Sequence, residues 1–195
     1  MKIIAVTDDK KAIRQLIDTL LTIDSSIDAV ILREKSKTDA EVILLLQQLI
    51  EAGFDTTKII VHVRSHIAAM MGITKVQLPG NSTALPTCSF GRSVHSFDEA
   101  QVAYLAGADW VLYGHLFATN SKEGVPPRGT EELFRITAAL PIPVYAIGGI
   151  QPQHLPALQL GGVAGVAIMS AIFGSDEPIA TLSAYKEMSS RVSTS

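Results

Sequence analysis

The segments Ala146-Ile147-Gly148-Gly149-Ile150 and Ala167-Ile168-Met169-Ser170, both near the end of the chain, decide the fold. In each, an apolar run of strand length ends in residues that let backbone N–H groups come close to a ligand. In a (β/α)₈ barrel the loops after strands 7 and 8 form a phosphate site, and a helix N-terminus beyond them adds unpaired N–H donors. The alternative for either segment alone is a buried strand followed by ordinary turn residues. The two together favour a phosphate site in which side chains stay small.

Apolar runs of strand length occur eight times in the chain and alternate with helical patterns. Continuous apolar runs are typical of parallel strands that are covered on both faces, and the alternation predicts right-handed strand–helix–strand units. The predicted strands are Ile3–Thr7, Asp28–Leu32, Lys58–His62, Thr74–Leu78, a weak Cys88–Arg92, Asp109–Tyr113, Pro143–Ile147 and Val163–Ile168. The predicted helices are Lys10–Ile23, Asp39–Ala52, Arg64–Met71, Phe97–Ala106, Glu131–Leu140, Pro152–Gln159 and Ile179–Val192.

The expected fold class is therefore α/β, a (β/α)₈ TIM barrel forming a single compact domain over residues 1–195, with a frayed C-terminal tail at 189–195. The segment Pro79–Thr87, between the fourth and fifth predicted strands, is too short and too rich in Pro and Gly for a full helix. A doubly wound open sheet is the competing architecture. It would carry a Gly-rich phosphate loop after its first strand, and Val6-Thr7-Asp8-Asp9-Lys10 is not one.

Composition excludes several classes of protein. The net charge of −3 comes without a basic stripe, so we expect no nucleic-acid partner. A lone cysteine, Cys88, leaves no internal disulfide and is typical of a reducing cytoplasm, where we expect the protein to lie. The chain enters the strand-like run Ile3-Ile4-Ala5-Val6 at once, so no signal peptide is expected.

One segment, from Ile136 to Ser175, contains no Asp, Glu, Lys or Arg. A membrane span needs roughly 20 consecutive apolar residues, whereas Pro and Gln residues interrupt this segment repeatedly. We interpret it as buried strands alternating with a helix and expect no membrane partner.

Candidate functional residues follow the carboxyl ends of the predicted strands, where barrel enzymes place their active sites. His115 comes directly after Trp110–Gly114, and an imidazole with an unperturbed pKa of about 6.5 suits proton transfer. The alternative is a histidine that bonds the loop backbone. His95 is the weaker candidate because it precedes a capping box at Ser96–Glu99. The alternative is that its only role is to order that turn. The other candidates at strand ends are Arg33, Glu34, Lys35, His62, Arg64, Gln77, Arg92, Ser93, Thr119, Gly148, Gly149 and Ser170.

Two sets of cations could serve an anionic ligand. Arg33 and Lys35 either pair with it or are solvated loop charges, and Lys122 and Arg128 lie in the longest connection, Ala118–Gly129, which could act as a lid. The sequence has no Ser-His-Asp order, no zinc-ligand spacing and no P-loop, so we expect no metal and no cofactor.

Five segments in this order resemble the thiamine phosphate synthase/TenI superfamily, over nearly the whole chain. The likeness is greatest to its TenI branch, the thiazole tautomerases. The segments are Ile31–Ser36, Gly91–Ser96, Tyr113–Thr119, Ala146–Ile150 and Ala167–Ser170.

The resemblance implies a metal-independent isomerase of thiamin biosynthesis that aromatises a carboxythiazole phosphate by moving a ring proton onto an exocyclic carbon. His115 would be the acid/base, and the partner would be a phosphorylated thiazole; a homo-oligomer is left open. The substrate phosphate would bind backbone at Gly148, Gly149, Met169 and Ser170, and the pocket would be lined by Arg33, Lys35, Ser93 and Thr119.

Departures from the synthase side of the superfamily favour the tautomerase. The synthases carry an Asn-Asp pair after strand 3 and an acidic residue after strand 4 for magnesium-pyrophosphate. This chain has His62-Val63-Arg64 and Leu78-Pro79-Gly80-Asn81 instead, without the carboxylates that magnesium prefers. The synthases have Gln where this chain has Ile31, and Pro where it has His115. The alternatives are the synthase itself, a thiazole-phosphate-binding regulatory barrel without turnover, and, more remotely, another phosphosugar isomerase barrel.

Overall fold

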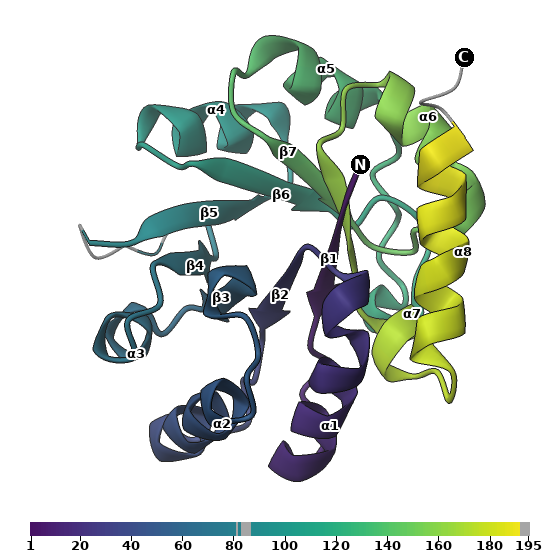
Figure 1. The fold of residues 1–195 in the computed structure, drawn as a ribbon. Coiled ribbons are helices and arrows are strands. Elements are labelled where there is room, and N and C mark those ends of the chain that lie inside the picture. Colours follow the sequence, from purple (N-terminus) through teal and green to yellow (C-terminus); the bar gives the residue numbers. More distant parts are fainter. Residues whose placement is uncertain (81, 83–86, 192–195) are drawn as a thin grey trace.

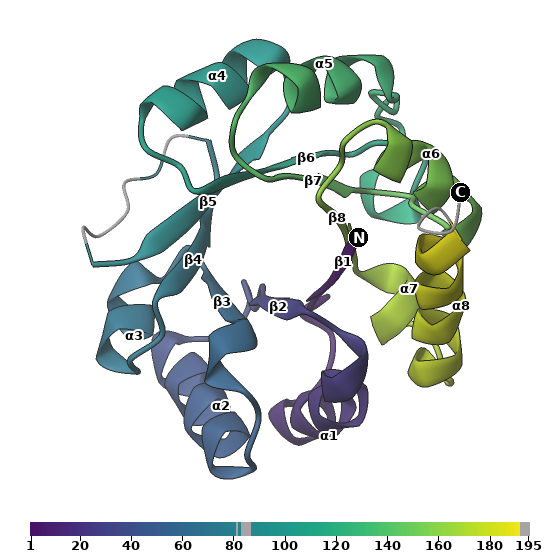
Figure 2. The same ribbon diagram turned by 45° about the horizontal axis from the view of Figure 1, so that its top comes forward.

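A computed structural model describes residues 1–80, 82 and 87–191 of the chain. The described residues form eight parallel strands in a closed barrel, with each strand paired to the next and β8 paired back to β1 (Figures 1 and 2). The predicted TIM-barrel fold is confirmed. The strands are β1 (Lys2–Val6), β2 (Ala29–Leu32), β3 (Ile59–His62), β4 (Lys75–Leu78), β5 (Ser89–Val94), β6 (Trp110–Gly114), β7 (Val144–Ile147) and β8 (Gly165–Ile168).

Helices surround the barrel on the outside (Figure 2). A helix follows each strand except β4, as the alternation predicted, and β8 is followed by two. Between β4 and β5 the described residues include no helix. Part of the predicted Pro79–Thr87 link lies outside the described residues. The helices are α1 (Ile13–Ile23), α2 (Asp39–Glu51), α3 (Ser65–Met70), α4 (Phe97–Leu105), α5 (Glu131–Ala139), α6 (Leu155–Leu160), α7 (Ser170–Phe173) and α8 (Pro178–Ser190). Single 3₁₀ turns are η1 (Asp24–Ser26), η2 (Thr56–Lys58), η3 (Asn120–Lys122) and η4 (Pro152–His154).

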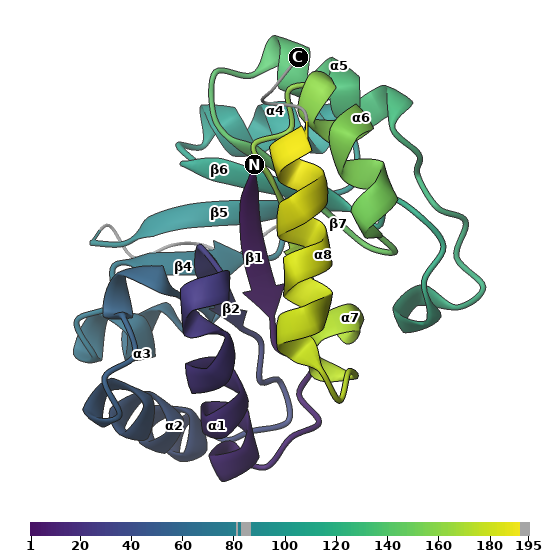
Figure 3. The same ribbon diagram turned by 45° about the vertical axis from the view of Figure 1, so that its right-hand side comes forward.

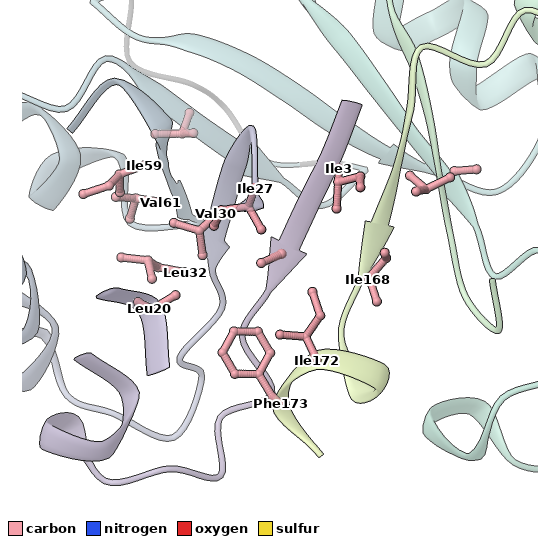
Figure 4. Close-up of a cluster of buried hydrophobic side chains, with 14 of the residues drawn as sticks. Ile3, Leu20, Ile27, Val30, Leu32, Ile59, Val61, Ile168, Ile172 and Phe173 are labelled. Carbon is pink, nitrogen blue, oxygen red and sulfur yellow. The ribbon is translucent and has the colours of Figure 1, made fainter. Parts of the chain in front are cut away.

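Alternation along the strands divides the apolar side chains between two cores. Ile3 and Ala5 of β1 pack outward against the helices, while Ile4 and Val6 point into the barrel. Figure 4 shows the outer core where β1, β2 and β3 meet α1 and α7. The core inside the barrel consists of Ile4, Val6, Ile31, Ile60, Leu112, Tyr145 and Ala167, and it forms the floor beneath the carboxyl ends of the strands.

Local signals at helix ends were only partly correct. Thr38 and Glu41 form a capping box at α2. At α4, Ser96 caps Glu99 N–H, but the Glu99 carboxylate accepts from His95 N–H, so the second bond of the box is replaced. In α1 the helix begins at Ile13, later than predicted.

The charge-free segment forms β7, η4, α6, β8 and α7, as interpreted from its sequence. Within residues 1–80, 82 and 87–191, no helix is long and apolar enough to cross a membrane. Of the predicted frayed tail, residues 189–190 belong to α8, and 192–195 lie outside the described residues.

Candidate active site

A cavity of about 340 Å³ opens at the carboxyl ends of the strands. It brings together the residues that the family resemblance assigned to the catalytic and substrate-binding roles. Those residues are Arg33, Lys35, Ser93, His115, Thr119, Gly148, Gly149, Met169 and Ser170. The same cavity is lined by the other candidates His62, Gln77 and His95, and by Lys122 of the predicted lid. Ser121 also lines it, although no pattern in the sequence marks this residue.

Three other candidates have structural contacts instead and do not line the cavity. Glu34 is 1% exposed and bonds the Lys37 ammonium group. Arg64 donates to the Asp39 carboxylate and to backbone carbonyl groups of the β2–α2 loop. Arg92 donates to the carbonyl oxygens of residues 79 and 80, at the start of the β4–β5 link.

Residues that follow β1 fix the loop after β2 by hydrogen bonds, and this holds Arg33 and Lys35 at the rim of the cavity. Arg33 N–H donates to Thr7 Oγ1 at 2.8 Å, and Ser36 donates to the Asp9 carboxylate through both its N–H and its hydroxyl. Burial would raise the pKa of Asp9, but the bonds from Ser36 outweigh it and lower that pKa, so the carboxylate stays charged. Asp9 does not cap a helix, because α1 begins after Ala12 without a side-chain cap.

His62 lies on the same side of the cavity as these cations. Burial, together with the positive charges of Arg33, Lys35 and Arg64, lowers its pKa from 6.5 to about 4. The imidazole is therefore neutral near pH 7. This wall of the cavity presents two permanent cations and one neutral ring, an arrangement suited to an anionic ligand group.

A chain of hydrogen bonds fixes the direction of the Ser93 hydroxyl. The Trp110 indole can only donate, and its Nε1–H bonds Gln77 Oε1 at 2.9 Å. The Gln77 amide must therefore direct its Nε2–H group to Ser93 Oγ, which accepts at 3.1 Å. Because the hydroxyl oxygen is the acceptor in this bond, its own proton is available to a ligand atom in the cavity. Gly91 leaves room for this chain, since a Cβ there would lie 1.9 Å from Trp110 Nε1.

His115 follows β6 and is 8% exposed. Its Nε2 atom lies 3.2 Å from the Val125 carbonyl oxygen of the lid. His95, at the end of β5, bonds the carbonyl oxygen of Gly114 through Nδ1 at 2.7 Å. The two imidazoles thus lie at the ends of neighbouring strands, and both line the cavity.

The glycine pair after β7 allows close packing against the loop that carries His115. Gly148 and Gly149 have φ values of 103° and 64°, which L side chains rarely adopt. A Cβ at Gly148 would lie 2.3 Å from His115 Cβ, and one at Gly149 would lie 2.3 Å from the Ala118 carbonyl oxygen. Side chains must stay small here, as expected, but the limit is imposed by the adjoining loop, through His115 Cβ and the Ala118 carbonyl oxygen.

The opposite lip of this part of the cavity is formed by the start of α7. Ser170 and Ala171 are its first two residues, and the first backbone N–H groups of a helix have no partner within it. The earliest amides that bond back are those of Ile172 and Phe173, both to the Met169 carbonyl oxygen. Backbone donors at the ends of β7 and β8 therefore border the cavity, and β1 alone separates β8 from β2, the strand that precedes Arg33 and Lys35.

The connection between β6 and α5 covers the site and extends away from the barrel at the right of Figure 3. Arg128 ties it down: Nη1 donates to the His95 carbonyl oxygen at 2.8 Å, and Nε donates to that of Gly114 at 3.2 Å. Arg128 N–H also donates to the His115 carbonyl oxygen. The predicted lid is thus fastened directly to the two histidines.

Magnesium does not fit the donor set of this cavity. Its lining, within the described part of the chain, includes no Asp or Glu. No group of three or more His, Cys, Asp or Glu side chains among residues 1–80, 82 and 87–191 could hold a metal ion. Magnesium is bound in proteins mainly through carboxylates and phosphates, so the cations and imidazoles present here suit a metal-free anion.

Comparisons with known proteins agree with the resemblance of the segments. A family model described as thiamine monophosphate synthase (TMP-TENI) matches residues 3–172. The chain is 31% identical over 159 residues to the thiamine-phosphate synthase of Anaeromyxobacter dehalogenans, which covers 77% of this chain and 72% of that protein. It is 40% identical over 92 residues to the thiamine-phosphate synthase of Pyrococcus horikoshii, but this match spans only 44% of that protein.

Among solved structures, the thiamine phosphate pyrophosphorylase of Pyrococcus furiosus superposes with a TM-score of 0.80 at 25% identity, covering 98% of this chain and 96% of that one. The likeness thus extends over the whole barrel. The chain belongs to the TMP-TENI family of thiamin-biosynthesis enzymes.

Proposed function

We propose that the protein is a thiazole tautomerase, which aromatises a carboxythiazole phosphate by moving a proton from the ring to the exocyclic carbon. The observation that carries this proposal is His115, a buried imidazole at the end of β6 that lines a cavity whose described lining includes no carboxylate. A positioned acid/base group contributes roughly 10²–10⁴-fold to such a step. Orientation of the substrate by anchors on both sides supplies the rest.

The two ends of the cavity suit the two anionic groups of this substrate. The phosphate would lie against the backbone donors of Gly148, Gly149, Met169 and Ser170, where glycine and a helix start permit close approach. The carboxylate would lie at Arg33 and Lys35, with the Ser93 hydroxyl as a further donor. The thiazole ring would then be held between them, beside His115.

The second candidate is thiamine phosphate synthase, and the names of the relatives favour it. That reaction joins a pyrimidine pyrophosphate to the thiazole phosphate, and the resemblance implies magnesium held by carboxylates after strands 3 and 4. In this chain β3 ends in His62, and the cavity-lining residues that the structure describes carry cationic and neutral groups only. We therefore propose the tautomerase ahead of the synthase.

Two assays on the purified protein separate these functions. The tautomerase converts carboxythiazole phosphate to its aromatic form in the presence of EDTA, and it forms no thiamin phosphate from pyrimidine pyrophosphate, thiazole phosphate and magnesium. Magnesium-dependent formation of thiamin phosphate would establish the synthase instead. Tight binding of thiazole phosphate without either activity would indicate a regulatory barrel.

A further inference from the structure

The hydrogen bonds around His95 determine which of its ring nitrogens carries the proton. Its Nδ1 atom lies 2.7 Å from the Gly114 carbonyl oxygen. A carbonyl oxygen can only accept, so Nδ1 must be the donor. In the neutral ring Nε2 then has no proton and presents a lone pair. Because His95 lines the cavity, a ligand bound there would lie beside the residue that carries this basic nitrogen.

The backbone of His95 is fixed as firmly as its ring. Its N–H group donates to the Glu99 carboxylate at 2.8 Å, and its carbonyl oxygen accepts from Arg128 Nη1 at 2.8 Å. Arg128 Nε also donates to the same Gly114 carbonyl oxygen that holds Nδ1. Three elements, β6, the start of α4 and the lid, thus hold His95 in one tautomer and one orientation.

His115 is held in the complementary state. Its Nε2 atom lies 3.2 Å from the Val125 carbonyl oxygen, so this nitrogen must carry the proton when the contact is made. His95 therefore presents a lone pair on Nε2, whereas protonated His115 keeps its Nε2–H bond to Val125 and carries its second proton on Nδ1. An acid and a base in separate residues are what a proton shift between two different atoms of one substrate requires.

We propose that His95 is a second catalytic residue, the general base of the reaction, and that His115 is its general acid. His95 Nε2 takes the proton from the ring carbon, and the electron pair of that C–H bond enters the ring and completes aromatisation. The electron pair of the exocyclic double bond takes the Nδ1 proton of the His115 imidazolium, whose Nε2–H group stays bonded to the Val125 carbonyl oxygen. The substrate loses one proton and gains one, and exchange with solvent restores both histidines. This inference rests on the proposed tautomerase function.

Two substitutions of His95 separate a base from a positioning residue. The amide N–H group of Asn stands where Nδ1–H stands, so His95→Asn keeps the bond to the Gly114 carbonyl oxygen but has no nitrogen at the Nε2 position. His95→Gln extends an amide toward the Nε2 position but cannot accept a proton there. We expect both variants to fold and to lower kcat by about 10²-fold or more. His95→Asn that turns over at close to the wild-type rate would show that His95 only holds the backbone, and would overturn the inference.

Nitrogen NMR of ¹⁵N-histidine-labelled protein tests the tautomer without any turnover. At a pH above the titration of free histidine, we expect His95 to show a protonated Nδ1 and an unprotonated Nε2. A protonated Nε2 would overturn the inference, whatever the kinetics show. Wild-type protein without tautomerase activity would defeat the proposed function, whereas an active wild type with an active His95→Asn variant would defeat only the role of His95.

Discussion

At the scale of single residues, groups that can only donate or only accept set the direction of the hydrogen bonds around the cavity. The Trp110 indole N–H orients the Gln77 amide, and the amide in turn leaves the Ser93 proton free for a ligand. The Gly114 carbonyl oxygen fixes the His95 tautomer in the same way. The site is therefore arranged to meet hydrogen-bond acceptors, such as carboxylate and phosphate oxygens, in the region of Ser93.

His62 makes stability depend on pH. Its pKa is about 4 in the folded protein against 6.5 for the free side chain, so between these values the unfolded chain binds a proton that the folded protein does not. The free energy of unfolding therefore falls as the pH falls from 6.5 toward 4, by about 2 kcal/mol at pH 4.5. Between pH 7 and pH 4.5, we expect the free energy of unfolding to fall by about 2 kcal/mol more in wild type than in His62→Gln. Urea denaturation at both pH values measures this difference. Equal losses in the two proteins would show that His62 titrates normally.

At the scale of elements, the site is made where β7, β8 and the lid converge. The glycine pair after β7 brings the loop bearing His115 against the barrel, and α7 begins directly at the cavity. Arg128 connects the lid to the ends of β5 and β6. The proposed acid/base groups and the proposed phosphate donors thus lie on different loops of one barrel.

Opening of the lid depends on Arg128. Arg128→Met removes the bonds to the carbonyl oxygens of Gly114 and His95, which together are worth about 1–2 kcal/mol. We expect a lysine-specific protease to cut after the exposed Lys122 roughly tenfold faster in this variant. The matched control is Arg135→Met, which removes a cation–π contact with Phe97 on α4 and leaves the lid alone. Equal cleavage rates in the two variants would mean that Arg128 does not fasten the lid.

The phosphate position can be tested with a pair of variants that differ only in charge. Ser170→Asp and Ser170→Asn are nearly the same size, and an acidic residue at the start of α7 is compatible with the helix. Repulsion between a carboxylate and a nearby bound phosphate reduces the binding free energy by about 2 kcal/mol at the edge of the protein. The Ser170→Asp variant should therefore bind thiazole phosphate about thirtyfold more weakly than the Ser170→Asn variant. Calorimetric titration measures the two affinities. Equal affinities would place the phosphate elsewhere in the cavity.

At the scale of the whole molecule, the sequence predicts the barrel and its mouth well, because both follow from local patterns. Apolar runs mark the strands, and parallel strands end at the same rim, so residues such as Arg33 and Ser170 meet although they lie far apart in the chain. The contacts between strands and loops could not be predicted. The register of β4, β5 and β6 determines the bonds of Gln77 with Ser93 and Trp110. The path of an irregular loop brings Val125 to His115, and no periodicity marks it.

The most direct test of the account compares wild type with His115→Asn on carboxythiazole phosphate. The account predicts that kcat falls by about 10²–10⁴-fold, because Asn cannot transfer a proton. The affinity for the aromatic thiazole phosphate should remain within about threefold, because the proposed phosphate donors belong to the loops after β7 and β8. A variant that turns over at the wild-type rate would contradict the central claim that the His115 imidazole moves the proton.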